Sequence, residues 1–277
     1  MKTRFWRKTA PRAAFILLAL ILCLGILAGC GAGGKNAGGD KLDPAKDLER
    51  IRSRGTLLVG VTDYPPMDYL EDGEWTGFDA DLARLFGNWL EVEVQFVEID
   101  WSKKVQLLES GEIDCIWNGL TKTDELAEKI TLSRIYLFNS QVVVMADGQF
   151  DKYDSLEKCS HLLFAVEDGS VGQELAESSS YRCMKYANQV EALSGVLNKQ
   201  CDAAIVDRII AASETGKGKA FQELSYDFSL GEEDICVGLR KGSALEEQIN
   251  DFFTVYTAEG TISRLAGKYS LFDALFR

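Results

Sequence analysis

The sequence of 277 residues contains a single histidine, His161, and only four prolines. One histidine argues against a histidine-ligated metal site and against a hydrolase that uses histidine as its base. Glycine and proline are too sparse for a fibrous protein, and 46% hydrophobic residues are too many for a disordered chain. We therefore expect a globular protein without a metal site or a cofactor, built as one large domain or two of ordinary size.

Basic residues are outnumbered, with 30 Lys and Arg against 43 Asp and Glu and a formal net charge of −13. Five of the basic residues and none of the acidic ones lie before Cys30, which leaves 25 basic and 43 acidic residues in the rest of the chain. Phosphate backbones repel so acidic a surface, and we expect no nucleic-acid partner.

Residues 1–29 have the pattern of a secretory signal peptide. A basic run from Lys2 to Arg12 precedes an apolar stretch from Ala13 to Leu27. This stretch of about 15 residues is short for a bilayer span of roughly 20 residues and suits the apolar region of a signal. It ends in the sequence LAGC, which resembles the lipobox of bacterial lipoproteins. The resemblance implies cleavage before Cys30 and lipidation of its sulfur; the alternative is an uncleaved anchor with an incidental cysteine.

Residues 30–44 are rich in glycine and predict a flexible tether between this anchor and a folded body. The expected location is the extracytoplasmic face of a bacterial membrane, where disulfides can form. Three cysteines stand close to predicted strands that would share one sheet edge, Cys159, Cys183 and Cys201. We expect a bridge between Cys159 and Cys183, with three free thiols as the alternative.

Two similar successions of strands and helices follow one another. The first has strands at 56–61, 92–99 and 113–117 and helices at 78–89 and 101–110. The second has strands at 162–166, 184–187 and 203–206 and helices at 172–178 and 190–198. Such alternation predicts parallel sheets with helical crossovers. Two β runs, at 141–145 and 235–239, join the two sets.

The predicted fold is therefore α/β with two lobes. One lobe comprises residues 45–139 plus 237–277 and the other residues 140–236, and two parallel-core sheets are joined by two β-strand crossings that serve as a hinge. Ligands of open α/β sheets bind beyond the carboxyl ends of the strands, so the lobes should enclose a cleft there.

Six segments resemble the family 3 amino-acid-binding proteins of bacterial ABC importers. They are GVTDYPPM at 60–67, GFDADLA at 77–83, LLESGEID at 107–114, WNGLTKT at 117–123, CDAAIVD at 201–207 and VGLRKG at 237–242. The resemblance spans roughly residues 48–269 and implies a type II periplasmic-binding-protein fold. It also implies a small-molecule ligand, namely an amino acid or a related small polar solute.

The resemblance assigns a position for the ammonium of the ligand. Asp207 matches the aspartate that binds this group, because an unpaired charge in a dry cleft is costly. Thr121 matches the residue that meets the ligand, and the carbonyls near Asn118 and Gly119 complete the ammonium site. The structural alternative for Asp207 is the N-cap of the helix that follows it.

The other end of the ligand is assigned to the start of a helix. The N–H groups near Ser170 and Val171 would hold its carboxylate, although 169–172 could also be an ordinary capping turn. Tyr64 and Trp101 match the aromatic residues that flank the side chain of the ligand. Glu167 and Asp168 stand where the family varies with its ligand, and two acids there favour a polar or cationic side chain unless they are only solvated loop residues.

One departure concerns the carboxylate clamp. The family usually continues T-x-E-R after this point, whereas Thr123-Asp124-Glu125 is followed here by Leu126. A leucine cannot supply the paired, charge-assisted bonds of an arginine. Lys122 could replace the charge, the ligand could lack a free α-carboxylate, or the protein could bind weakly and serve another role.

We therefore expect a monomeric, lipid-anchored solute-binding protein that performs no catalysis and delivers its ligand to an ABC permease in the membrane. One alternative is a module that presents the ligand-bound shape to a membrane receptor. The second alternative is a dehydratase-like enzyme on the same fold, for which Glu167 and Asp207 are the candidate acid and base.

Overall fold

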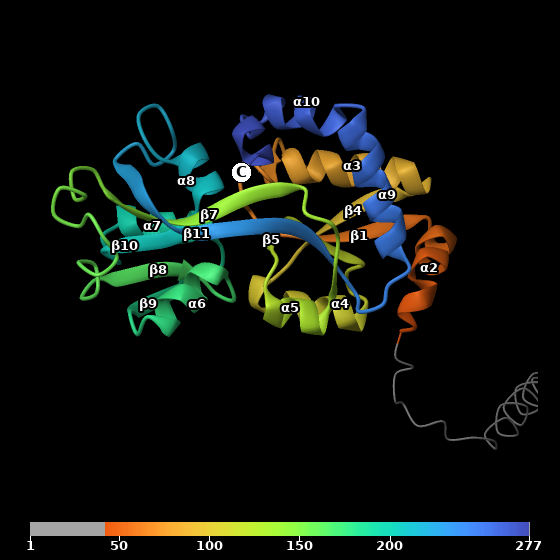
Figure 1. The fold of residues 1–277 in the computed structure, drawn as a ribbon, viewed down its shortest axis with the longest axis horizontal. Coiled ribbons are helices and arrows are strands. Elements are labelled where there is room, and N and C mark those ends of the chain that lie inside the picture. Colours follow the sequence, from red (N-terminus) through yellow and green to blue (C-terminus); the bar gives the residue numbers. More distant parts are fainter. Residues whose placement is uncertain (1–41, 277) are drawn as a thin grey trace, which may run out of the picture. The chain divides into compact units, whose positions relative to one another are not determined.

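The structure, a computed structural model, describes residues 42–276, in which strands and helices alternate as predicted (Figure 1). Parallel strands in the order β4-β1-β5 form the core of the first lobe: β1 (Thr56–Val61), β4 (Glu93–Glu98) and β5 (Cys115–Thr121). Parallel strands in the order β10-β8-β9 form the core of the second lobe: β8 (Leu163–Glu167), β9 (Arg182–Tyr186) and β10 (Ala203–Asp207).

Two long strands connect the lobes, β7 (Leu137–Ala146) and β11 (Leu224–Leu239). β11 pairs with β5 and β7, and β7 pairs with β10, all antiparallel. The two sheets expected from the sequence are therefore continuous in hydrogen bonding, as one sheet of nine strands. The pairing of β7 with β11 shifts register between Asp227 and Glu232, and such irregularities bend a strand locally.

Helices cover both faces of the first-lobe strands, with α3, α9 and α10 on one face and α4 and α5 on the other (Figure 1). Their bounds are α2 (Asp47–Arg54), α3 (Phe78–Leu90), α4 (Lys104–Ser110), α5 (Asp124–Lys129), α9 (Leu245–Ala258) and α10 (Thr261–Lys268). The second lobe holds α6 (Val171–Ser178), α7 (Gln189–Leu197) and α8 (Arg208–Glu214). Shorter elements are η1 (Pro44–Lys46), β2 (Tyr69–Glu71), β3 (Glu74–Thr76), η2 (Trp101–Lys103), β6 (Thr131–Leu132) and η3 (Phe272–Leu275).

The cysteines correct one prediction, since all five in residues 42–276 are free thiols. Cys159 is fully buried and packs into the apolar core of the second lobe. Cys183 lies on β9, in register with Phe164 of β8, and is partly exposed. The predicted bridge between Cys159 and Cys183 is thus absent, and both thiols instead contribute apolar contact to the core of the second lobe.

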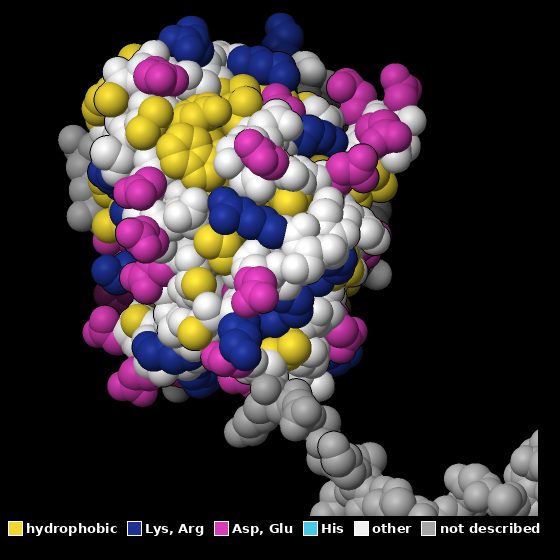
Figure 2. Space-filling model, turned by 90° about the vertical axis from the view of Figure 1, so that its right-hand side faces the viewer, with side chains coloured by type: hydrophobic (Ala, Val, Ile, Leu, Met, Phe, Trp, Pro, Cys, Tyr) yellow, Lys and Arg dark blue, Asp and Glu magenta, His cyan; other side chains and the backbone are white. Residues whose placement is uncertain are grey.

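The predicted signal peptide, the Cys30 lipidation site and tether residues 30–41 lie outside the described residues. Between residues 42 and 276 no helix is long and apolar enough to cross a membrane. Figure 2 shows one face of the first lobe, on which acidic and basic side chains are interspersed around a cluster of hydrophobic ones. No continuous basic stripe crosses this face of the described residues.

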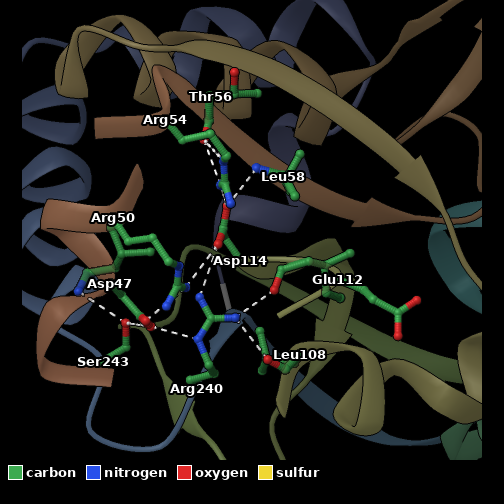
Figure 3. A network of polar contacts seen from close by, with 12 residues as sticks. Asp47, Arg50, Arg54, Thr56, Leu58, Leu108, Glu112, Asp114, Arg240 and Ser243 are labelled. Atoms are coloured by element: carbon green, nitrogen blue, oxygen red, sulfur yellow. Dashed lines mark hydrogen bonds and ion pairs between the residues drawn. The ribbon is translucent and has the colours of Figure 1, made fainter. Parts of the chain in front are cut away.

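A buried network of charged side chains fastens α2 to the ends of the first-lobe strands (Figure 3). Arg240, which follows β11, is 3% exposed, and its Nε donates to Asp47 Oδ2 at 2.9 Å. Its Nη2 donates to Asp114 Oδ1 at 3.1 Å, and its Nη1 donates to the carbonyls of Leu108 at 2.8 Å and Ile113 at 2.7 Å. Both aspartates are fully buried. Arg50 of α2 also pairs with Asp47 at 3.0 Å and with Asp114 at 3.3 Å, and Arg54 of α2 pairs with Asp114. The three arginines together neutralise charges that water cannot reach.

Replacing Arg240 should therefore destabilise the fold. We expect Arg240→Met to lower the free energy of unfolding by about 3–5 kcal/mol, because it leaves buried carboxylates short of a cation. Urea unfolding at pH 7 measures the loss. Arg52→Met is the matched control, since Arg52 is an exposed residue of α2 and its loss should change stability by at most about 0.5 kcal/mol. Equal effects of the two substitutions would contradict this account of the network.

Candidate functional site

A cavity of about 400 Å³ lies where the carboxyl ends of strands from both lobes converge. Its walls come from the residues after β1, the end of β5, the turn after β8 and the end of β10. This is the place predicted for the cleft. Nine of the ten predicted ligand-binding residues line it: Tyr64, Trp101, Asn118, Gly119, Thr121, Glu167, Ser170, Val171 and Asp207.

Lys122 is the exception, because its side chain does not line the cavity. Its amide donates to the carbonyl of Asp234 at 2.8 Å and extends the pairing of β5 with β11. The lysines that do line the cavity are Lys104 and Lys129, neither of which the sequence analysis named. Lys129 forms an ion pair with Glu125 at 2.6 Å. Lys104, by contrast, forms no ion pair with any carboxylate among residues 42–276.

Asp207 is surrounded by side-chain amides. Its Oδ1 accepts hydrogen bonds from Asn139 Nδ2 at 2.7 Å and from Gln141 Nε2, and its Oδ2 accepts one from Gln189 Nε2 at 2.7 Å. The carboxylate makes no capping bond to α8, so the alternative reading as a helix N-cap does not describe this side chain. Burial raises the pKa of Asp207, and the amides that stabilise its charged form oppose the rise.

Strand register explains this arrangement. Asn139 and Gln141 are two residues apart on β7 and so project from the same face of the sheet. Asn139 lies opposite Glu233 of β11, and Gln141 lies opposite Asp207 of β10. Both amides therefore stand between two acids, and Asn139 Nδ2 donates to Glu233 Oε2 at 2.7 Å as well as to Asp207. Sequence analysis missed these amides, although polar residues at alternate positions of an apolar β run were a signal.

Two more buried acids neighbour Asp207. Glu167, 4% exposed, lines the cavity and accepts a bond from Gln189 Nε2 at 3.5 Å. Burial, with the charge of Asp207, raises the pKa of Glu167 to about 8, and Lys104 opposes this rise. Burial and Asp207 likewise raise the pKa of Glu233 to about 8. This end of the cavity is thus rich in carboxyl groups that prefer to stay protonated.

The first-lobe wall is held by a different set of bonds. The side chain of Asn118 accepts from Thr62 N at 3.2 Å and donates to Asp68 Oδ2 at 2.7 Å, so its amide fixes this wall. The ring of Tyr64 packs on Gly119, whose φ of +60° and crowded Cα leave no room for a Cβ. The Tyr64 hydroxyl is buried beside Asp207 without a hydrogen bond of normal geometry, and burial, followed by the charge of Asp207 and contact with its carboxylate, raises the pKa of Tyr64.

The start of α6 meets its prediction only in part. Ser170 is the N-cap, and its Oγ accepts a bond from Gln173 N at 3.2 Å. The amide of Ser170 already donates to the carbonyl of Glu167 at 3.2 Å. Val171 is the first residue of the helix, and an N–H in that position has no carbonyl partner within its own helix. An anion at this end of the cavity would therefore meet Val171 rather than Ser170.

The two lobes touch at one edge of the cavity. Lys104 Nζ donates to the carbonyl of Gly169 at 2.8 Å and lies 4.7 Å from the ring centre of Trp101. Gly169 has a φ of +78°, and a Cβ on it would approach Ser102 Cα to 2.7 Å. Only glycine fits this contact, because any side chain would push the residues after β8 away from η2.

Leu126 lines the cavity from the first turn of α5 and is 9% exposed. It occupies the position at which the clamp arginine was expected, and it offers only apolar contact. Arg134 does not replace it, because its Nη1 donates to Thr254 Oγ1 at 2.6 Å on α9. Among residues 42–276 no group of three or more His, Cys, Asp or Glu side chains could hold a metal ion.

Sequence comparison finds known proteins that resemble this chain over most of its length. Residues 57–272 match the profile of the family described as bacterial extracellular solute-binding proteins, family 3. The ABC transporter glutamine-binding protein GlnH of Bacillus subtilis (strain 168) is 26% identical over 272 residues, which are 95% of this chain and 97% of that protein.

Solved structures give the same picture. A histidine-bound substrate-binding protein of an ABC uptake transporter from Streptococcus pneumoniae superimposes with a TM-score of 0.77 at 25% identity, over 85% of this chain and 100% of that one. The ancestral amino-acid-binding protein AncCDT-1, a precursor of cyclohexadienyl dehydratase, gives 0.75 at 28% identity, over 80% of this chain and 98% of that one.

Leu126 allows a test of where a carboxylate would bind. We expect Leu126→Arg to strengthen the binding of a plain α-amino acid by about tenfold or more, because a guanidinium makes paired, charge-assisted bonds to a carboxylate. Calorimetry with a small panel of amino acids measures the gain. Leu126→Met conserves the volume without adding charge and should change little. Without a gain over that control, the carboxylate of the ligand does not bind beside this residue.

Gly169 allows a test of the contact between the lobes. We expect Gly169→Ala to hold the lobes apart and to weaken ligand binding, because the new methyl group would overlap Ser102. Gly148→Ala is the matched control, since Gly148 has a similar φ of +77° and nothing within 4 Å of the added Cβ. X-ray scattering with and without ligand reports the spacing of the lobes, and identical behaviour of the two variants would rule out a steric role for this glycine.

Proposed function

Because the chain belongs to the bacterial extracellular solute-binding proteins of family 3, we propose that it captures an amino acid or a related small polar solute between its lobes and delivers it to an ABC importer. The observation that carries this proposal is Asp207, which is 5% exposed, lines the cavity and is held by three side-chain amides. Such a carboxylate is suited to pair with the ammonium of a solute.

Capture would depend on closure of the two lobes about β7 and β11. We assign residues 45–139 plus 237–277 to the first lobe and residues 140–236 to the second. The cavity has walls from both, so a bound solute contacts both lobes and stabilises the closed form over the open one. The closed form would then dock on the permease.

A lipid on Cys30 would keep the protein at the extracytoplasmic face of the membrane, with the glycine-rich segment as its tether. This arrangement confines the protein to the surface where its permease lies.

The experiment that tests the function is the identification of a bound solute. We expect native mass spectrometry of the protein purified from its own host to show one small polar solute bound per chain. The Asp207→Ala variant should be purified without this solute, and its affinity for the solute should be at least about a hundredfold lower, since removing one partner of a buried charge pair costs about 3–5 kcal/mol. Circular dichroism should show that the variant is folded. Unchanged affinity would remove Asp207 from the site.

An enzyme is the second candidate, because Glu167 faces the cavity and burial raises its pKa to about 8. A carboxyl group that is protonated near neutral pH can act as a general acid. Recovering the solute unchanged after long incubation with the protein would favour binding over catalysis. Accumulation of a product would favour the enzyme.

A further inference from the structure

We propose that the solute carries a net positive charge, as a basic amino acid or a related amine does, and that its cationic group binds between Asp207 and Glu167. This inference rests on the proposed function and names the class of solute for the same cavity. It is argued from the number, position and partners of the charged groups around these two acids.

The two carboxylates are neighbours in one wall of the cavity. Gln189 Nε2 donates to Asp207 Oδ2 at 2.7 Å and to Glu167 Oε2 at 3.5 Å, so a single nitrogen atom bridges them. Both side chains line the cavity and are 4–5% exposed. A planar guanidinium or an ammonium placed before them would donate to both acids at once.

The amides hold these acids but do not neutralise them. Asn139 and Gln141 each donate to Asp207 and to Glu233, and Gln189 donates to Asp207 and Glu167. The two hydrogens of every amide are thereby used, whereas an ionised carboxylate accepts about four bonds, so acceptor positions remain. None of the three acids forms an ion pair among residues 42–276.

The remaining charged groups do not supply the missing cation. Lys104 lowers the pKa of Glu167, but among residues 42–276 it forms no ion pair with either acid, and its Nζ donates to the carbonyls of Trp101 and Gly169 instead. Burial also lowers the pKa of Lys104 to about 8, so near that pH it carries only part of its charge. Lys129 is paired with Glu125. Glu174 adds a further acid to the lining of the cavity.

Tyr64 belongs to the same group of polar side chains. Its side chain is 3% exposed and lines the cavity, and its hydroxyl lies beside Asp207 without a hydrogen bond of normal geometry. Burial, the neighbouring Asp207 and the charges of Glu233 and Asp79 raise its pKa, so the hydroxyl stays protonated. It can therefore donate to Asp207 and accept a bond from an N–H of a ligand.

In the absence of a bound cation, protons neutralise the acids of the cavity. Burial and Asp207 raise the pKa of Glu167 and of Glu233 to about 8, so at pH 6 both acids are largely protonated. A bound cation favours their ionised forms and must displace these protons. Affinity should therefore level off only above pH 8, where both acids are ionised, and should fall below pH 8 by up to about tenfold per pH unit for each proton released. Lys104, whose pKa burial lowers to about 8, gains its charge as the pH falls through the same range and repels a cation, so it acts in the same direction.

The test uses the full protein with seven solutes: arginine, lysine, agmatine, putrescine, glutamine, asparagine and glutamate. We expect one of the four cationic solutes to bind at least tenfold more tightly than any neutral or acidic one, and its dissociation constant to rise at least tenfold from pH 8 to pH 6. Calorimetry in two buffers of different ionisation enthalpy should detect the released protons. Arginine against agmatine, which lacks the α-carboxylate, separates a basic amino acid from a simple amine.

Glu167→Gln should weaken the binding of the cationic solute about tenfold or more and should make its dissociation constant less dependent on pH. Glu191→Gln is the matched control, since it removes an exposed acid from α7 and should leave both unchanged. If the Glu167→Gln variant does not fold, the pH series on the native protein decides. The inference is overturned if the protein prefers glutamine or glutamate, or if its affinity for the cationic solute does not change with pH. Either result leaves the proposed function standing. Binding of no solute at all overturns both.

Discussion

The arrangement of the cavity depends on one buried carboxylate, that of Asp207, which has no ion-pair partner among the described residues. Asp207 is buried at the end of β10, and hydrogen bonds from neutral amides compensate only part of the hydration energy that its charge loses on burial. Those amides come from β7 and α7, and a further acid comes from β11. The groups that hold the charge thus lie largely on the strands that join the lobes, so the binding chemistry and the joint between the lobes share the same residues.

The Arg240 network shows the same physics with the opposite outcome. There, Asp47 and Asp114 are also fully buried, but the chain supplies the guanidinium groups of Arg240, Arg50 and Arg54, and two carbonyls accept the remaining bonds of Arg240 (Figure 3). Such a closed network ties α2, β5 and the end of β11 into one rigid lobe. At Asp207 the described residues provide amides, further acids and the Tyr64 hydroxyl, and none of them forms an ion pair with it.

Periodicity was sufficient to predict the alternation of strands and helices, because it is local, and the resemblance to a known family supplied most of the lining residues. Thr121 and Asp207 stand at the ends of β5 and β10, and ligands of open α/β sheets bind beyond the carboxyl ends of the strands. Asn139, Gln141 and Glu233 could not be placed in the same way, since their meeting depends on the register between strands that are distant in the chain. Lys122 failed for a similar reason: its amide joins the β5–β11 pairing, and Lys104, on a neighbouring element, reaches the cavity instead. The cysteine pairing depended on side-chain directions within a core, which the spacing of residues does not contain.

The register of β7 has a consequence for how this protein could change during evolution. Asn139 and Gln141 face two different neighbouring strands from one short stretch of β7. Any substitution of these two residues would also alter the cross-strand contacts of β7, one of the strands that join the lobes. The bonding of Asp207 and the pairing of the joining strands would therefore change together among related sequences.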